Sequence, residues 1–425
     1  MVYLGNEKRD KASCIDLFLG GFARVCFGYM QVSGNLTFRL VTIDFTKRQI
    51  KKIKIMATNR RLWLKQIGLG IVGIGLANVK SYASPVISKD FIDNLENQNS
   101  LIFLRSNENP YGPSPLARKV FVDNANISNR YNWDVATQLI SDLAKRNSVK
   151  DENILLGAGS TEILDLVAKF VSLDKGNYVI ADPSYDYWTV TLDNLGLKKN
   201  KVPLTTDKKI NLQAMLEVVN QDTKLVYICN PNNPTGTICE RETLVEFVTK
   251  ISQNTIVLID EAYLGFTKQQ SLSNIVNDHK NIIIAKTFSK MYGLAGARIG
   301  YAIANKTIID NLANLQSNTN NSVSVLSKLA AIASLKDDKF VSNCYLLNEN
   351  VRQYTINELK KLNCECISSN TNFIYFSLAK YNKDYFKQLE NNNIQGGRIY
   401  EEQGKWTRIT VGTMQEMKQF IKAIQ

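Results

Sequence analysis

The segment ILLGAGSTEILDLVAKFV (residues 154–171) decides the fold class of this chain. Its first four residues have the composition of a buried strand, and a glycine-rich turn then leads directly into a helical pattern. The apolar residues that fall on one stripe of this helix are Ile163, Leu166, Val167 and Phe170. A strand that passes through a tight turn into an amphipathic helix is the first half of a βαβ unit. The segment therefore predicts a parallel sheet covered by helices.

The same alternation continues along the chain. Further apolar strands are predicted at 178–181, 225–229, 256–259, 282–285 and 299–302. Residues 242–251 repeat the amphipathic helical pattern. We therefore expect an α/β fold whose large domain has a mostly parallel sheet with helices on both faces.

The pattern changes after about residue 305. Longer helical stretches are followed by strands near 373–376 and 408–411 and by a closing helix from Met414, which is typical of a smaller α+β domain. No Pro/Gly linker marks the join, so we expect the two domains to pack tightly, with a long helix between them. The predicted division is 84–124 for an N-terminal arm and part of the small domain, 125–305 for the large domain, and 306–425 for the small domain.

The charge of the chain is concentrated at its N-terminus. The formal net charge is +13, but residues 1–83 alone hold fourteen Lys and Arg against four Asp and Glu. The remainder has an ordinary enzyme balance, so the charge does not indicate nucleic-acid binding. With one histidine, His279, and seven cysteines without a CxxC spacing, the chain offers little material for a metal site or a disulfide framework.

Residues 56–83 resemble a twin-arginine export signal. Arg60 and Arg61 precede an uncharged apolar run over 67–77, which is too short to span a bilayer, and small residues precede a cleavage point after Ala83. This predicts an exported, periplasmic protein without a stable membrane anchor. The alternative is an apolar helix with a chance arginine pair and a cytoplasmic protein. Residues 1–55 show no clear periodicity and stay unassigned, and with Met56 as the start of the signal they would lie upstream of the true start.

Polar groups follow several predicted strands, where ligands bind in open parallel sheets. The turn 157–161 can present backbone N–H groups to a phosphate at a helix N-terminus, and Asp260 ends a very apolar strand. In TFSKMYGLAGAR (287–298), Lys290 lies beside a serine and eight residues before Arg298. A lysine nucleophile must lose its proton near neutral pH, which burial and a nearby cation favour.

The order and spacing of these motifs resemble the class I/II aminotransferases, which are fold-type I pyridoxal-phosphate enzymes, and within them the histidinol-phosphate aminotransferase group. The resemblance covers residues 101–425. The motifs that carry it are SNENPYG (106–112), GAGST (157–161), PSY (183–185), NPTG (233–236), DEAY (260–263), SK (289–290) with Arg298, and RITVG (408–412).

The resemblance implies a pyridoxal 5′-phosphate site built around Lys290. Lys290 would hold the cofactor as a Schiff base and move the substrate proton, and Asp260 would pair with the pyridinium nitrogen. Asn233 and Tyr263 would bind the ring oxygen O3′, and Tyr185 would stack on the ring. The phosphate would be bound by a set that includes a tyrosine from the second subunit of a homodimer. That set is Gly159, Ser160, Thr161, Thr287, Ser289, Arg298 and the partner-facing Tyr131.

Arg408 and Arg398 match residues that bind the substrate carboxylate or phosphate, and Asn109 is also assigned to substrate binding. The implied partners are a small amino donor, such as histidinol phosphate, and a 2-oxo acid such as 2-oxoglutarate. Two features depart from the histidinol-phosphate group: residues 86–101 lack the expected Pro-Tyr element, and an exported enzyme would not meet cytoplasmic intermediates of histidine synthesis.

Two other functions remain open at this point. A decarboxylase or lyase acting on a phosphorylated amino acid can use the same scaffold, because the fold does not determine which Cα bond breaks. A pyridoxal-phosphate-sensing DNA-binding regulator would need a helix-turn-helix, and residues 1–83 show none of its pattern.

Overall fold

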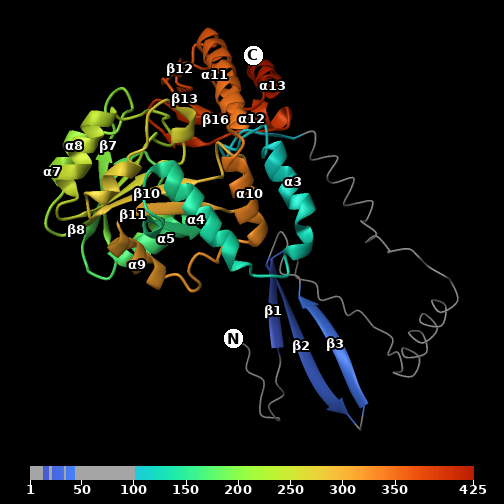
Figure 1. The fold of residues 1–425 in the computed structure, drawn as a ribbon. Helices are drawn as coiled ribbons and strands as arrows, with labels where there is room; N and C mark the ends of the chain where they lie inside the picture. Colours follow the sequence, from blue (N-terminus) through green and yellow to red (C-terminus); the bar gives the residue numbers. More distant parts are fainter. Residues whose placement is uncertain (1–12, 19–21, 33–34, 44–100) are drawn as a thin grey trace. The chain divides into compact units, whose positions relative to one another are not determined.

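A seven-stranded sheet forms the centre of residues 101–425 in the computed structural model, which describes residues 13–18, 22–32, 35–43 and 101–425 (Figure 1). The strand order is β5-β11-β10-β9-β8-β6-β7. Only β11 is antiparallel to its neighbours, which confirms the predicted mostly parallel sheet. The strands are β5 (Ile154–Gly157), β6 (Asn177–Asp182), β7 (Lys198–Pro203), β8 (Thr223–Cys229), β9 (Ile256–Asp260), β10 (Ile282–Thr287) and β11 (Gly300–Ala304).

The edge strand β7 has no counterpart among the sequence predictions. It contains three lysines in six residues, and only Val202 is buried. Lysine-rich edge strands protect a sheet from pairing with other chains, and their composition hides them from a search for apolar runs.

Helices cover both faces of this sheet, because successive strand residues point in opposite directions. Ile284 of β10 belongs to one core cluster and Ile283 to the other. The helices that contribute to the first cluster are α3 (Pro115–Asp123), α4 (Trp133–Asn147), α7 (Leu212–Val218), α8 (Arg241–Ile251) and α10 (Val325–Leu335). Those that contribute to the second are α5 (Ser160–Val171), α6 (Val190–Asn194) and α9 (Lys306–Asn314).

A smaller antiparallel sheet follows, with the order β12-β13-β16-β15. It consists of β12 (Glu365–Cys366), β13 (Phe373–Ser377), β15 (Ile399–Glu401) and β16 (Trp406–Thr410). It shares a core with α11 (Asp338–Lys361), α12 (Tyr385–Asn391) and α13 (Met414–Ile424). The short strand β4 (Ile102–Phe103) pairs in parallel with β14 (Ile394–Gln395), so the start of this unit lies beside its C-terminal part.

Three helices lie between the two sheets along the chain. The chain leaves β11 through α9, continues into α10, and after the break at Lys336 and Asp337 forms the 24-residue α11 (Figure 1). The remaining elements are the short 3₁₀ helices η1 (Ala125–Ile127), η2 (Asp151–Asn153), η3 (Tyr187–Thr189), η4 (Leu264–Phe266) and η5 (Ser273–Asn277). No helix in the described part of the chain is long and apolar enough to cross a membrane.

Residues 1–88 form a separate compact unit. Its described part is an antiparallel sheet of β1 (Ser13–Phe18), β2 (Phe22–Val32) and β3 (Asn35–Ile43). This corrects the sequence analysis, which found no strand pattern before residue 56. Apolar residues adjoin one another along β2, so the period-two test fails there. The predicted export signal at 56–83 lies outside the described residues.

Candidate active site

Five groups of predicted site residues lie after five strands of the large sheet. They follow β5, β6, β8, β9 and β10, whose carboxyl ends meet at one edge because these strands run in the same direction. The sheet therefore brings together side chains that are up to about 130 residues apart in the sequence.

Asp260, at the end of β9, is a buried carboxylate without an ion-pair partner in the described part of the chain. The Tyr227 hydroxyl donates to its Oδ2 at 3.2 Å, and the backbone N–H of Ala262 donates to its Oδ1 at 3.0 Å. Burial raises the pKa of Asp260 to about 6, although both of these donors and Lys290 act to lower it. A carboxylate in this position is suited to a ligand that supplies a positive charge.

Lys290 lies beyond β10, in the turn that follows Ser289. Its Nζ donates to the carbonyl of Ser106 at 2.9 Å and lies 5.7 Å from the centre of the Tyr263 ring. Burial lowers the pKa of Lys290 to about 8, and the positive charge of Arg408 adds to this effect. A substantial share of the amine is then neutral near physiological pH, as a nucleophile requires.

The hydroxyl of Tyr263 lies at the centre of a buried amide cluster. It accepts hydrogen bonds from Nδ2 of Asn107 at 2.9 Å and from Nδ2 of Asn233 at 3.4 Å. The ring meets Phe373 edge-on at 5.0 Å between centroids. Burial raises the pKa of Tyr263 well above its ordinary value, so the hydroxyl keeps its proton and can donate it to a ligand oxygen.

An anion cradle forms where the turn after β5 meets the turn after β10. Arg298 directs Nη2 toward Thr161 Oγ1 and Nη1 toward Ser289 Oγ, each at 3.4 Å. The backbone N–H of Ser289 donates to Thr287 Oγ1 at 3.0 Å. Gly159 precedes α5 with φ +78°, and a Cβ there would collide with the Arg298 guanidinium. Ser160 is the first residue of α5, so backbone N–H groups at the helix N-terminus also face an anion.

Arg408 lies on β16, and its side chain is buried. It donates hydrogen bonds to the side-chain oxygen of Asn233 and to the carbonyl of Arg105. Its guanidinium lies between two aromatic rings, 5.3 Å from the centre of Phe373 and 5.3 Å from that of Tyr400. Such packing holds a guanidinium in one orientation.

Arg398 lies beside the same tyrosine but nearer the surface. Its guanidinium is 5.1 Å from the centre of Tyr400 and 5.2 Å from that of Tyr187. The ring of Tyr400 therefore contacts both predicted substrate arginines, Arg398 and Arg408.

Three other predicted site residues differ in how far they are buried. Tyr185 is partly buried, and burial with the nearby Asp260 charge raises its pKa to about 12. Asn109 donates to the Met291 carbonyl at 2.8 Å and accepts from the Tyr111 N–H, so its amide braces the turn after Lys290. Tyr131 is 73% exposed and stacks on the ring of Trp133, so a single chain does not bring it into the site.

The model of the family described as "Aminotransferase class I and II" matches residues 99–424. The chain belongs to this family. It is 32% identical to the histidinol-phosphate aminotransferase of Moorella thermoacetica over 331 residues, which cover 76% of this chain and 85% of that protein. The predicted recognition and the transaminase assignment are thereby confirmed.

Solved structures of two other proteins show the same fold. One is a histidinol-phosphate aminotransferase from Sinorhizobium meliloti in complex with pyridoxal 5′-phosphate, with 24% identity, coverage of 82% of this chain and 97% of that one, and a TM-score of 0.70. The other is an L-threonine-O-3-phosphate decarboxylase from Porphyromonas gingivalis, with 24% identity, coverage of 76% and 98%, and a TM-score of 0.65.

The residues of this aminotransferase fit its family's cofactor, pyridoxal 5′-phosphate. Asp260 lacks a cationic partner among the described residues and would pair with the ring nitrogen, while the Arg298 cradle would hold the phosphate. Tyr263 and Asn233 would bind the ring oxygen. When bound, the cofactor supplies an electron sink that stabilises the charge left on the substrate's Cα.

The side chains of the aminotransferase would then have three tasks. Lys290 Nζ would hold the cofactor and, when its amine is free, would move the proton of the substrate Cα. Asp260 would keep a proton on the ring nitrogen, because its negative charge favours the protonated ring. Arg408 would bind a substrate carboxylate and so fix which Cα bond faces Lys290.

The structure also assigns contacts to residues that the sequence analysis did not select. Asn107, Tyr227, Phe373 and Tyr400 all contact site residues. Asn107 lies within a recognised motif, so its position was a usable signal. The other three lie within strands, where an aromatic residue is ordinarily interpreted as core.

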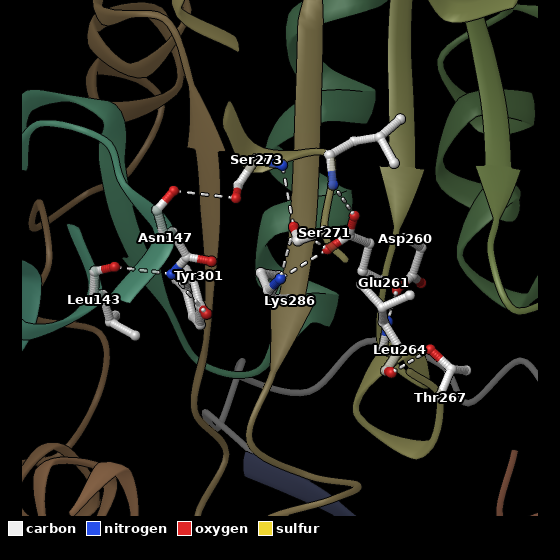
Figure 2. Close-up of polar contacts among 12 residues, drawn as sticks. Leu143, Asn147, Asp260, Glu261, Leu264, Thr267, Ser271, Ser273, Lys286 and Tyr301 are labelled. Carbon is white, nitrogen blue, oxygen red and sulfur yellow. Dashed lines mark hydrogen bonds and ion pairs between the residues drawn. The ribbon is translucent and has the colours of Figure 1, made fainter. Parts of the chain in front are cut away.

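A buried ion pair lies close to Asp260 and joins Lys286 to Glu261, the residue that follows Asp260 (Figure 2). Lys286 Nζ is 2.7 Å from Glu261 Oε2 and 2.9 Å from Ser271 Oγ, and the Leu272 N–H donates to the other oxygen of Glu261 at 2.9 Å. Lys286 and Glu261 share the sheet face of Tyr301, whereas Tyr227 shares a core cluster with Leu258 on the opposite face. Glu261 is thus paired and braced on the far side of the sheet from the site. In the described residues, no cluster of acidic, His and Cys side chains could hold a metal ion.

Proposed function

We propose that this aminotransferase transfers the amino group of a phosphorylated amino donor, with histidinol phosphate as the leading candidate, to a dicarboxylic 2-oxo acid such as 2-oxoglutarate. One observation carries the proposal: two guanidinium groups, Arg408 and Arg398, lie on the same tyrosine ring at 5.3 Å and 5.1 Å. Two such groups suit the two carboxylates of 2-oxoglutarate, and the fork of arginine can bind the phosphate of the amino donor in the same way.

Steady-state kinetics with a panel of donors tests the substrate. Histidinol phosphate, histidinol, phenylalanine and tyrosine would each be paired with 2-oxoglutarate. The proposal expects kcat/KM for histidinol phosphate to exceed that for histidinol by at least about 100-fold, since a bound phosphate contributes several charge-assisted hydrogen bonds. Equal values for the two donors would refute it.

The decarboxylase alternative has its own test. A transaminase converts the bound cofactor to its amino form when it is mixed with an amino donor alone, and a 2-oxo acid reverses the change. Spectra recorded with glutamate and then with 2-oxoglutarate should show this reversible pair. Carbon dioxide release without the spectral change would support the alternative.

We further propose a homodimer in which Tyr131 of each subunit completes the phosphate site of the other. Its exposure of 73% and its stack on Trp133 present an aromatic surface that a second copy could cover. Mixing inactive Lys290→Ala with Tyr131→Ala tests this, because a mixed dimer would have one site with both residues intact. Half of the refolded dimers would be mixed, and each mixed dimer would have one intact site out of two. The mixture should therefore recover about a quarter of wild-type activity. No recovery above the two parents would contradict the shared site.

We also infer that residues 56–83 direct export of the folded, cofactor-loaded chain. The paired arginines and the short apolar run support this. Sequencing the N-terminus of the protein from its native cell should give a start at Ser84. A cytoplasmic protein that begins near Met56 would refute the inference.

A further inference from the structure

Tyr227 makes a buried contact with Asp260, and the roles given above for the site residues assign no function to this contact. Its hydroxyl donates to Asp260 Oδ2 at 3.2 Å, and neither side chain is more than 2% exposed. The two lie on neighbouring parallel strands, where Tyr227 pairs with Leu258 and Cys229 with Asp260. Strand alternation therefore directs the tyrosine and the carboxylate to the same face of the sheet.

The tyrosine ring is held in place from the other side. Trp188 meets it edge-on at 5.0 Å between centroids, with 68° between the ring planes. The second oxygen of Asp260 accepts the Ala262 N–H at 3.0 Å. Each carboxylate oxygen thus has one fixed donor, which sets the plane of the carboxylate and leaves each oxygen a free lone pair.

We propose that Tyr227 is a positioning residue that holds the Asp260 carboxylate ionised and oriented toward the ring nitrogen of the cofactor. The proposal rests on the assigned pyridoxal-phosphate transaminase function. It concerns a residue that would touch neither the cofactor nor the substrate.

The charges around Asp260 agree with this role. Burial raises the pKa of Asp260, and Tyr227 is one of the groups that lower it again. The titratable groups that face Asp260 are Tyr185, Tyr227, Cys229, Tyr263 and Lys290, and Glu261 acts on it through its charge from the other face of the sheet. Burial raises the pKa of the tyrosines and of Cys229, which keeps them neutral, so Tyr227 stabilises the anion as a donor.

The test compares Tyr227→Phe with a matched control, Tyr178→Phe. Tyr178 is also fully buried in the same core cluster and donates to a carboxylate, Asp193 Oδ1, at 2.6 Å, but this contact is remote from the site. Both changes remove one hydroxyl from a buried ring. A general loss of stability would therefore affect both variants, whereas a loss of positioning would affect only Tyr227→Phe.

The holoenzymes would be compared by activity, by cofactor dissociation constant and by the pH dependence of the cofactor spectrum. For Tyr227→Phe we expect kcat to fall about ten-fold and the cofactor to bind about ten-fold more weakly, as for loss of one hydrogen bond to a charged group. The acid limb of kcat should move to higher pH, because Asp260 then takes up a proton more readily. Tyr178→Phe should match the wild type in all three.

The proposal would be overturned if Tyr227→Phe kept the acid limb of kcat and the cofactor affinity of the wild type. Equal changes in Tyr227→Phe and Tyr178→Phe would also overturn it. A wild-type enzyme without transaminase activity would instead refute the proposed function. The two failures are therefore distinguishable in one experiment.

Discussion

The side-chain oxygen of Asn233 accepts a hydrogen bond from the Arg408 guanidinium. Because arginine only donates, this contact fixes the orientation of the Asn233 amide and turns its Nδ2 toward the Tyr263 hydroxyl, 3.4 Å away. The substrate arginine and the residues assigned to the cofactor oxygen thus form one hydrogen-bonded chain. A change at either end should affect both binding events.

Replacement of Arg408 by lysine tests this chain. Lysine keeps the charge but loses the planar fork, so it cannot bind a carboxylate bidentately or lie flat between Phe373 and Tyr400. We expect KM for 2-oxoglutarate to rise by about 30-fold, equivalent to about 2 kcal/mol, with a smaller fall in kcat. Steady-state kinetics measures both. Arg398→Lys is the comparison, and an unchanged KM in Arg408→Lys would show that the carboxylate binds elsewhere.

Asp260→Asn should weaken cofactor binding at least about ten-fold and reduce turnover on the order of 100-fold, because a neutral amide neither attracts the protonated ring nor keeps its nitrogen protonated. In the enzyme without cofactor, the pKa of Asp260 is about 6. Cofactor affinity of the wild type should therefore rise as the pH increases through about 6, where the carboxylate becomes charged. The variant should lack this rise. Titrations of the apoenzyme from pH 5 to 7 would measure it, and parallel curves for the two proteins would contradict the assigned role.

The sequence was sufficient for six of the seven strands of the large sheet, because these six are apolar runs that end in polar turns. Lys290, Asp260 and Arg298 could be selected since their positions after strands agree with a single reaction. The contacts between strands could not be inferred in this way. Tyr227 lies inside an apolar strand, and its role depends on β8 being the neighbour of β9, which pairing alone decides.

Three other features of the chain also depend on contacts between separate segments. The importance of Tyr400 becomes visible only in the structure, where Arg398 and Arg408 pack against its ring. The strands β2 and β3 pair with each other. Apolar residues adjoin one another along β2, so it could not be predicted alone, whereas residues 35–40 of β3 alternate strictly and were a usable signal. The proposed role of Tyr131 requires a second subunit, which the structure of one chain cannot place.

The Lys286 and Glu261 pair should contribute mainly to stability. Glu261 has a side chain only 2% exposed, so Lys286→Met would leave a buried carboxylate without its cation. We expect the free energy of unfolding to fall by about 3 to 5 kcal/mol, as for other buried pairs that lose one partner. Denaturant unfolding of the apoenzyme would measure this change.

The double variant Lys286→Met with Glu261→Gln is the control for this pair. It removes the unpaired charge and should recover a large part of the lost stability. A double variant no more stable than Lys286→Met would show that the unpaired charge of Glu261 is not the cause of the loss.

The rate at which the apoenzyme captures pyridoxal 5′-phosphate should report the state of Lys290. Only the neutral amine attacks the cofactor aldehyde, and burial with the Arg408 charge lowers the pKa of Lys290 to about 8. The rate should therefore increase with pH through about 8, and at pH 7 roughly one-tenth of the lysine should be reactive, against well under 0.1% for an ordinary lysine. Stopped-flow absorbance across pH 6.5 to 9.5 would measure the midpoint. Lys290→Ala controls for noncovalent binding, and a rate that still rises steeply at pH 9.5 would mean that the site does not activate this lysine.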